Sequence, residues 1–178
     1  MRVIAGTAKG TILFAPRGRE IRPTLDRVRT SLFDILGRKL EGATFLDLFA
    51  GTGANGIEAL SRGAKMTWFV EKSIKAIQYI ETNLKKTHLT EKAIIIKAEL
   101  PQEVKLLPKG IDIIFMDPPY KFDKWEALIR SLILLNIPKH NSIIILEHSS
   151  FNPPLEEYPP LKKYRTEKYG DTILSFYS

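Results

Sequence analysis

The chain has 178 residues and no cysteine; 44% of its residues are hydrophobic and 26% are charged. These values fit one globular domain, and they exclude both a disulfide-built scaffold and a thiolate metal site. The absence of cysteine suits the reducing cytoplasm, where we expect the protein. The apolar stretches are too short to cross a bilayer, so we expect no membrane partner.

Positive charge is concentrated at the amino-terminal end. The formal net charge is +7, and residues 1–40 contain nine Lys and Arg residues against three acidic ones. Arginine-rich segments suit a phosphate-rich partner, because the planar guanidinium group matches the geometry of phosphate oxygens. The other interpretation is a solvated basic surface, and charge alone does not separate the two.

The first forty residues predict an extension that packs on a core formed by residues 41–178, the two making one structural domain. Residues 2–5 and 10–14 are predicted to form a β-hairpin. After a loop rich in Gly, Pro and Arg, apolar residues at helical spacing predict a helix that begins near Thr24 and ends near Gly37.

From Ala43 onward, predicted strands and helices alternate. The strands are expected at residues 44–48, 66–70, 93–97, 111–116 and 142–147, and the helices at residues 54–62, 73–86, 100–106 and 123–135. Continuous apolar runs in the strands indicate burial on both faces, which is typical of a parallel sheet covered by helices. Two further strands, at residues 162–169 and 172–177, are predicted to form an antiparallel hairpin around Gly170-Asp171.

This α/β pattern resembles the three-layer, Rossmann-like fold of class I methyltransferases. The resemblance implies a seven-stranded, mostly parallel sheet with the strand order 3-2-1-4-5-7-6, in which the first and fourth strands are neighbours. The segments that follow these two strands would then face each other across a cleft at the carboxyl edge of the sheet, where open α/β folds bind their ligands.

A glycine-rich turn with the spacing Gly51-x-Gly53-x-x-Gly56 follows the first predicted core strand. Such glycines let the backbone approach a ligand, and a nicotinamide dehydrogenase would use the same turn to hold a pyrophosphate. Asp47, just before the turn, would repel those phosphates but suits the cationic amino end of S-adenosylmethionine. Glu71 ends the next strand and can accept both ribose hydroxyls of an adenosine; the alternative is an acid that initiates the following helix.

The string Asp117-Pro118-Pro119-Tyr120 follows the fourth predicted strand. The amino group of a nucleobase is a poor nucleophile, because its lone pair is delocalised into the ring. The Asp117 carboxylate and the Pro118 carbonyl can accept hydrogen bonds from the two N–H groups of this amine. They would thereby direct its lone pair towards a methyl donor. The two prolines stiffen this corner, and Tyr120 can stack on a base that has left its neighbours. The alternative is a plain turn after a strand.

Several strings together extend the resemblance to nearly the whole chain: Arg2-Val3-Ile4-Ala5-Gly6, Arg22-Pro23-Thr24-x-Asp26-Arg27-Val28-Arg29, Asp47–Gly56 and Asp117–Tyr120. On these residues the chain resembles the RsmD family of bacterial 16S rRNA (guanine-N2)-methyltransferases. The resemblance implies transfer of a methyl group from S-adenosylmethionine to N2 of a guanine in 16S rRNA, within the small ribosomal subunit. It also implies a monomer that needs no metal.

The resemblance assigns roles to three groups of residues. The catalytic residues would be Asp117, Pro118 and Tyr120; the cofactor contacts Asp47, Phe49, Gly51, Gly53, Glu71, Ala98 and Glu99; and the RNA contacts Lys9, Arg22, Arg27 and Arg29. Ala98 stands where the family usually has Asp or Asn to read the adenine, so either Glu99 or backbone groups would do this. For Arg29 the alternative is an ion pair with Asp26 on the same helix.

Four other functions remain open at this point. Two are methyl transfer to adenine N6 or to a protein glutamine amide; the latter would more typically show Asn at position 117, and neither explains the Arg22–Arg29 string. A third is a non-catalytic rRNA-binding assembly factor, which loss of Asp47, Asp117 or the glycines would favour, yet all are present. The fourth, a nicotinamide oxidoreductase, is opposed by Asp47 and by the Asp-Pro-Pro-Tyr string.

Overall fold

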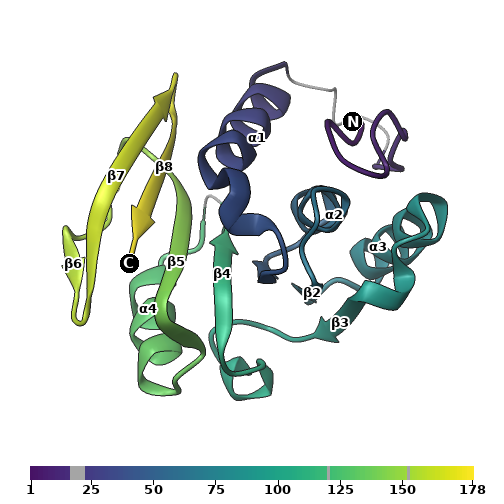
Figure 1. Cartoon of the computed structure of the whole chain (residues 1–178). Helices are drawn as coiled ribbons and strands as arrows, with labels where there is room; N and C mark the ends of the chain where they lie inside the picture. Colours follow the sequence, from purple (N-terminus) through teal and green to yellow (C-terminus); the bar gives the residue numbers. More distant parts are fainter. Residues whose placement is uncertain (17–22, 120, 152) are drawn as a thin grey trace.

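One mixed sheet organises the molecule (Figure 1). The computed structural model describes residues 1–16, 23–119, 121–151 and 153–178, with the backbone alone at residues 23–25. The strands are β1 (Thr44–Leu48), β2 (Met66–Glu71), β3 (Ala93–Lys97), β4 (Ile111–Met116), β5 (Pro138–Ser149), β6 (Glu157–Tyr158), β7 (Leu161–Tyr169) and β8 (Thr172–Tyr177). Their order in the sheet is β3-β2-β1-β4-β5-β8-β7-β6. Strands β1 to β5 are parallel, and β8 runs antiparallel between β5 and β7.

The predicted strand order is confirmed for the seven strands that the sequence indicated. The structure adds an eighth strand, β6, which has two residues and pairs with the start of β7 through Glu157 and Lys162. Strand β5 is also longer than the predicted segment 142–147. A two-residue strand carries no alternating pattern of apolar and polar residues, so the sequence does not predict it.

Helices cover both faces of the sheet. They are α1 (Pro23–Leu36), α2 (Ala54–Ser61), α3 (Ile74–Thr87) and α4 (Trp125–Leu134), with single 3₁₀ turns η1 (Gly37–Leu40), η2 (Thr90–Lys92) and η3 (Val104–Leu106). One buried cluster joins α1, α2 and α3 to the sheet around Phe45, Phe69 and Phe115. A second joins α4 and η3 to the opposite face around Leu46 and Ile114. The predicted three-layer α/β fold is therefore confirmed. Within the described ranges no helix has the length and apolar character needed to cross a membrane.

Two predicted elements are wrong. Residues 100–106 do not form an α-helix but only the 3₁₀ turn η3, and Pro108 stops any continuation of it. The predicted strands 2–5 and 10–14 are reduced to one bridge, between Arg2 and Ile12. The two arms of this segment are still joined by backbone hydrogen bonds, such as Val3 N–H to the Thr11 carbonyl at 3.0 Å.

The amino-terminal segment takes this irregular form because it is docked on helix α2. The buried carboxylate of Glu58 accepts hydrogen bonds from the N–H groups of Ile4 and Ala5, at 2.7 and 3.0 Å. Gly6 has a φ of +82°, and a Cβ atom there would lie 1.7 Å from the carbonyl oxygen of Ser61. The extension is thus held against the same helix whose first turn follows the glycine-rich turn.

Candidate active site

The glycine turn and the Asp-Pro-Pro corner leave the sheet side by side. Strands β1 and β4 are parallel neighbours, with Asp47 opposite Phe115 and Leu48 opposite Met116. Residues after Leu48 and after Met116 therefore emerge at the same carboxyl edge. The ring of Phe49 contacts that of Phe122, with centroids 4.9 Å apart and an interplanar angle of 65°. The predicted meeting of these two corners is confirmed.

Glycine is needed in the turn for two different reasons. Gly51 has a φ of +56°, and a Cβ atom there would face open space, its nearest neighbour being the Phe49 carbonyl oxygen at 4.0 Å. A Cβ atom on Gly56 would instead lie 2.2 Å from the Phe69 ring. Gly56 thus lets α2 pack on β2, whereas Gly51 leaves free the space in which a ligand could lie.

Asp47 lies beneath this turn with 1% of its surface exposed. Its Oδ2 accepts a hydrogen bond of 2.8 Å from the Gly56 N–H, which fixes the start of α2. Burial raises the pKa of Asp47 to about 7; the bond from Gly56 opposes this rise, and the charges of Asp117 and Glu71 add to it. The group is poised between its charged and neutral forms, so a nearby cation would favour the carboxylate.

Glu71 connects the glycine turn to the start of α3. Its Oε2 accepts the Gly51 N–H at 2.9 Å, and its Oε1 accepts the N–H groups of Lys72 and Ser73, each at 2.9 Å. These bonds match the helix-initiating alternative for this acid. They also hold the carboxylate at the rim of the turn, where its remaining lone pairs could accept hydroxyl groups.

The positions predicted to read an adenine follow β3, next to Glu71. Ala98 is buried, and its N–H donates a 3.2 Å hydrogen bond to the Glu71 carbonyl. Glu99 is exposed, and its carboxylate pairs with Lys72 Nζ at 3.1 Å. Both residues lie at the same sheet edge as the glycine turn, because Glu71 and Lys97 are opposite each other in the register of β2 and β3.

At the Asp-Pro-Pro corner, Asp117 is exposed and Pro118 is partly buried. The Pro119 carbonyl accepts the Phe122 N–H at 2.7 Å, which closes a turn and places the Phe122 ring against Phe49. Tyr120, the predicted stacking residue, lies outside the described residues.

Two residues to which the sequence assigns no role also belong to this edge. Glu147, near the end of β5, has its pKa raised to about 8 by burial and by the charge of Asp117. Its signal in the sequence is an acid directly after four apolar residues, at the carboxyl end of a strand. Asn83, buried on α3, donates from Nδ2 to the carbonyls of Thr52 and Phe14, at 3.0 Å each, and its Oδ1 accepts the Phe14 N–H at 2.7 Å. It ties the amino-terminal extension to the glycine turn.

The residues predicted to contact RNA do not all lie at the surface. Lys9 and Arg27 are exposed, and Arg22 lies outside the described residues. Arg29 is only 6% exposed. Its Nη2 donates to the Arg2 carbonyl at 2.8 Å and to Asp26 Oδ1 at 2.9 Å, and burial lowers its pKa. The ion-pair alternative is therefore observed for Arg29, and its buried guanidinium joins the first residues of the chain to α1. Its predicted contact with RNA stays a prediction.

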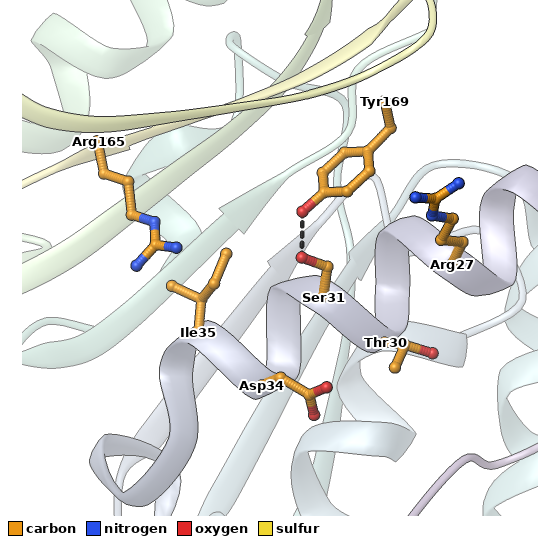
Figure 2. A pocket seen from close by; sticks show the side chains of 7 residues that line it. All are labelled: Arg27, Thr30, Ser31, Asp34, Ile35, Arg165 and Tyr169. Atoms are coloured by element: carbon orange, nitrogen blue, oxygen red, sulfur yellow. Dashed lines mark hydrogen bonds between the residues drawn. The ribbon is translucent and has the colours of Figure 1, made fainter.

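An open groove of about 650 Å³ separates α1 from β7 (Figure 2). Its lining residues are Arg27, Thr30, Ser31, Asp34, Ile35, Arg165 and Tyr169. The hydroxyl groups of Ser31 and Tyr169 are hydrogen-bonded across it. Arg27 from α1 and Arg165 from β7 line this groove from opposite sides. Positive charge therefore continues from the amino-terminal helix to the carboxy-terminal hairpin.

Comparison with known proteins agrees with this geometry. The family model described as "Conserved hypothetical protein 95" matches residues 1–178. The chain is 38% identical to "Putative rRNA methyltransferase YlbH" of Bacillus subtilis, over 99% of this chain and 98% of that protein. It is 34% identical to "Ribosomal RNA small subunit methyltransferase D" of Haemophilus influenzae, over 93% and 89% of the two chains. The solved structure of "Putative methyltransferase yhhF from Escherichia coli" superposes with a TM-score of 0.89 at 26% identity, over 99% and 96% of the chains. The chain belongs to the Conserved hypothetical protein 95 family, the RsmD family of methyltransferases.

Proposed function

We propose that the protein transfers a methyl group from S-adenosylmethionine to the exocyclic N2 of a guanine in small-subunit rRNA. The observation that carries the proposal is the position of Asp117 beside the glycine turn, at the carboxyl ends of the neighbouring strands β4 and β1. The names of the relatives, which refer to rRNA and to the small ribosomal subunit, support the choice of acceptor.

The residues of the turn fit S-adenosylmethionine, which would supply an electrophilic methyl group on a sulfonium. Transfer would break the bond between this methyl group and sulfur, leaving S-adenosylhomocysteine, and the acceptor nitrogen would lose one proton. Gly51 leaves open space above the turn, and Asp47 and Glu71 bring two carboxyl groups to it. Glu71 would accept the ribose hydroxyls, and Asp47 would favour the cationic methionine end. Phe49, Gly53, Ala98 and Glu99 complete the proposed cofactor contacts.

On the acceptor side, the Asp117 carboxylate and the Pro118 carbonyl would accept the two N–H bonds of the guanine amino group. This holds the nitrogen in one orientation, with its lone pair towards the donor. Positioning of this kind is worth at most about 7–11 kcal/mol of the barrier. Tyr120 would stack on the base once it has left its neighbours.

The basic extension would hold the RNA through phosphate contacts. Lys9 and Arg27 are exposed and remain candidates, together with Arg22. A monomeric cytoplasmic enzyme that meets the RNA in an assembled or nearly assembled subunit fits this assignment. Phosphate contacts make the affinity fall as salt rises.

The test is methyl transfer from radiolabelled S-adenosylmethionine to small ribosomal subunits from a bacterial strain that lacks its own RsmD-type enzyme. Digestion to nucleosides should place the label in N2-methylguanosine. Label in N6-methyladenosine would move the acceptor to adenine. Absence of any transfer, together with absence of S-adenosylmethionine binding in calorimetry, would refute the enzymatic assignment.

A further inference from the structure

Glu147 lies beside Asp117 on the neighbouring strand. Strands β4 and β5 are parallel, with Phe115 opposite Ile145 and Met116 opposite Leu146. Continuing this register by one residue brings Asp117 alongside Glu147. Phe115 and Ile145 both point into the core beneath α1, α2 and α3. Side chains two residues further along a strand point to the same face, so the carboxyl group of Glu147, within β5, faces that side of the sheet. Asp117, the first residue after β4, lies near enough for its charge to act on Glu147.

The carboxyl group of Glu147 has few polar neighbours among the described residues. Among the described residues, no hydrogen bond or ion pair to this group is formed. Its neighbour on β8 is Leu174, which is fully buried and apolar. The next residue, His148, turns its ring to Ser175 and to the Ser149 carbonyl.

In the described ranges, no group of three His, Cys, Asp or Glu residues is arranged to hold a metal ion. Among the described residues, Glu147 is not one of the buried polar groups left without a partner, so its carboxyl oxygens are accessible to a ligand. Burial and the charge of Asp117 favour its neutral form, which has one O–H donor and one carbonyl acceptor.

We propose that Glu147 recognises the Watson–Crick edge of the acceptor guanine, its carbonyl oxygen accepting N1–H and its O–H donating to O6, while Asp117 holds the N2 amino group. This rests on the proposed function. In guanine the donor N1–H lies next to the N2 amino group, and the acceptor O6 lies beyond it, so both oxygens of a neutral carboxyl group are satisfied.

Adenine presents a different edge. When its N6 amino group is held at Asp117, its neighbouring ring nitrogen N1 is an acceptor, and only a C–H group lies beyond it. The carboxyl group of Glu147 could then form one hydrogen bond instead of two, and its carbonyl oxygen would stay unsatisfied. Glu147 is thus a specificity-determining residue that favours guanine over adenine.

The test compares two substitutions. Glu147→Gln keeps one donor and one acceptor in the same place, whereas Glu147→Leu keeps similar volume and removes both. Single-turnover transfer to undermethylated small subunits is measured with each variant, together with S-adenosylmethionine affinity by calorimetry. Glu81→Gln, on the exposed face of α3, serves as the matched control.

We expect Glu147→Gln to stay within about threefold of the wild-type rate and Glu147→Leu to lose at least about tenfold, with cofactor affinity unchanged in both. A Leu variant with wild-type activity, or a Gln variant as impaired as the Leu variant, overturns the role of Glu147. A lower thermal midpoint for the Leu variant would indicate a structural role instead. If the wild-type protein labels an atom other than guanine N2, the proposed function fails independently of either variant.

Discussion

The ring of Phe49 in the glycine turn meets the ring of Phe122 edge-on, with centroids 4.9 Å apart. Phe49 follows β1 and Phe122 follows the Asp-Pro-Pro corner, so this one contact joins the proposed cofactor loop to the proposed acceptor loop. Phe49 has a φ of +63°, an unusual conformation for a residue with a side chain, which aims its ring at the opposite loop. The two loops are therefore held by each other as well as by the sheet.

Phe122→Ala should uncouple the two loops. Loss of an edge-to-face aromatic contact removes roughly 0.5–1.5 kcal/mol beyond the buried area, so we expect about a tenfold loss of methyl transfer with a small change in thermal midpoint. Phe151→Ala is the control, because that ring is 90% exposed. Equal rates for the two variants would show that the contact is dispensable.

Asp117→Ala should abolish methyl transfer while leaving S-adenosylmethionine affinity nearly unchanged. Without the carboxylate, the acceptor amine loses its orientation, and we expect a loss of about 10³-fold or more in the single-turnover rate. Asp123→Ala, an exposed acid in the same loop, is the matched control. An Asp117→Ala variant that works near the wild-type rate would contradict the proposed clamp.

Gly51→Ala should weaken cofactor binding because the alanine side chain would occupy space that the cofactor needs. Gly51 and Gly10 both have positive φ values, +56° and +85°, and a Cβ atom on either has open space around it. Alanine therefore costs a similar backbone strain of about 1 kcal/mol at both positions. Calorimetry should show at least about a tenfold loss of S-adenosylmethionine affinity for Gly51→Ala and none for Gly10→Ala. Parallel losses would attribute the effect to strain alone.

Arg27→Ala should weaken binding to the small subunit without changing cofactor affinity. Arg27 is exposed on α1 and faces the groove that Arg165 lines from β7. One lost phosphate contact should reduce affinity by about three- to tenfold and make it less dependent on salt. Lys92→Ala, on the exposed turn η2, provides a control for loss of one positive charge. The comparison is made by filter binding over a salt series.

The stability of the protein should depend on pH through Glu147. Its pKa is raised from 4.5 to about 8, so between these values the folded state keeps a proton that the unfolded state releases. The contribution of Glu147 to the unfolding free energy is therefore present in full below about pH 4.5 and is lost as pH rises towards 8.

Glu147→Gln should remove this loss of unfolding free energy at rising pH, because the glutamine amide does not titrate. Relative to the wild type, the variant should gain about 1–3 kcal/mol in unfolding free energy between pH 5 and pH 8, as measured by urea denaturation at both values. The difference between the two proteins reports the titration of Glu147 together with its interaction with the charge of Asp117. A constant difference across this range would place the pKa of Glu147 near its ordinary value.

Local patterns in the sequence were sufficient to predict the five parallel strands, the terminal hairpin and the helices α1 to α4, and they failed for the helix expected at residues 100–106. Apolar runs, helical spacing and glycine positions act within a few residues, and the structure preserves them. The strings around Gly51 and Asp117 are also local in the sequence, and they indicated the two loops of the candidate site. The resemblance to a known fold then supplied the strand order that makes β1 and β4 neighbours.

Such local patterns do not predict contacts between segments that are distant in the sequence. The sequence suggests that Arg29 is an exposed RNA contact. In the structure its side chain is buried and donates hydrogen bonds to Asp26 and the Arg2 carbonyl. Glu147 looks like an ordinary strand end, and only its register beside Asp117 gives it a role. Asn83 bridges Phe14 and Thr52, which lie 69 and 31 residues away. Burial, partners and charge at these positions depend on which strands and helices become neighbours, and that arises from packing of the whole chain.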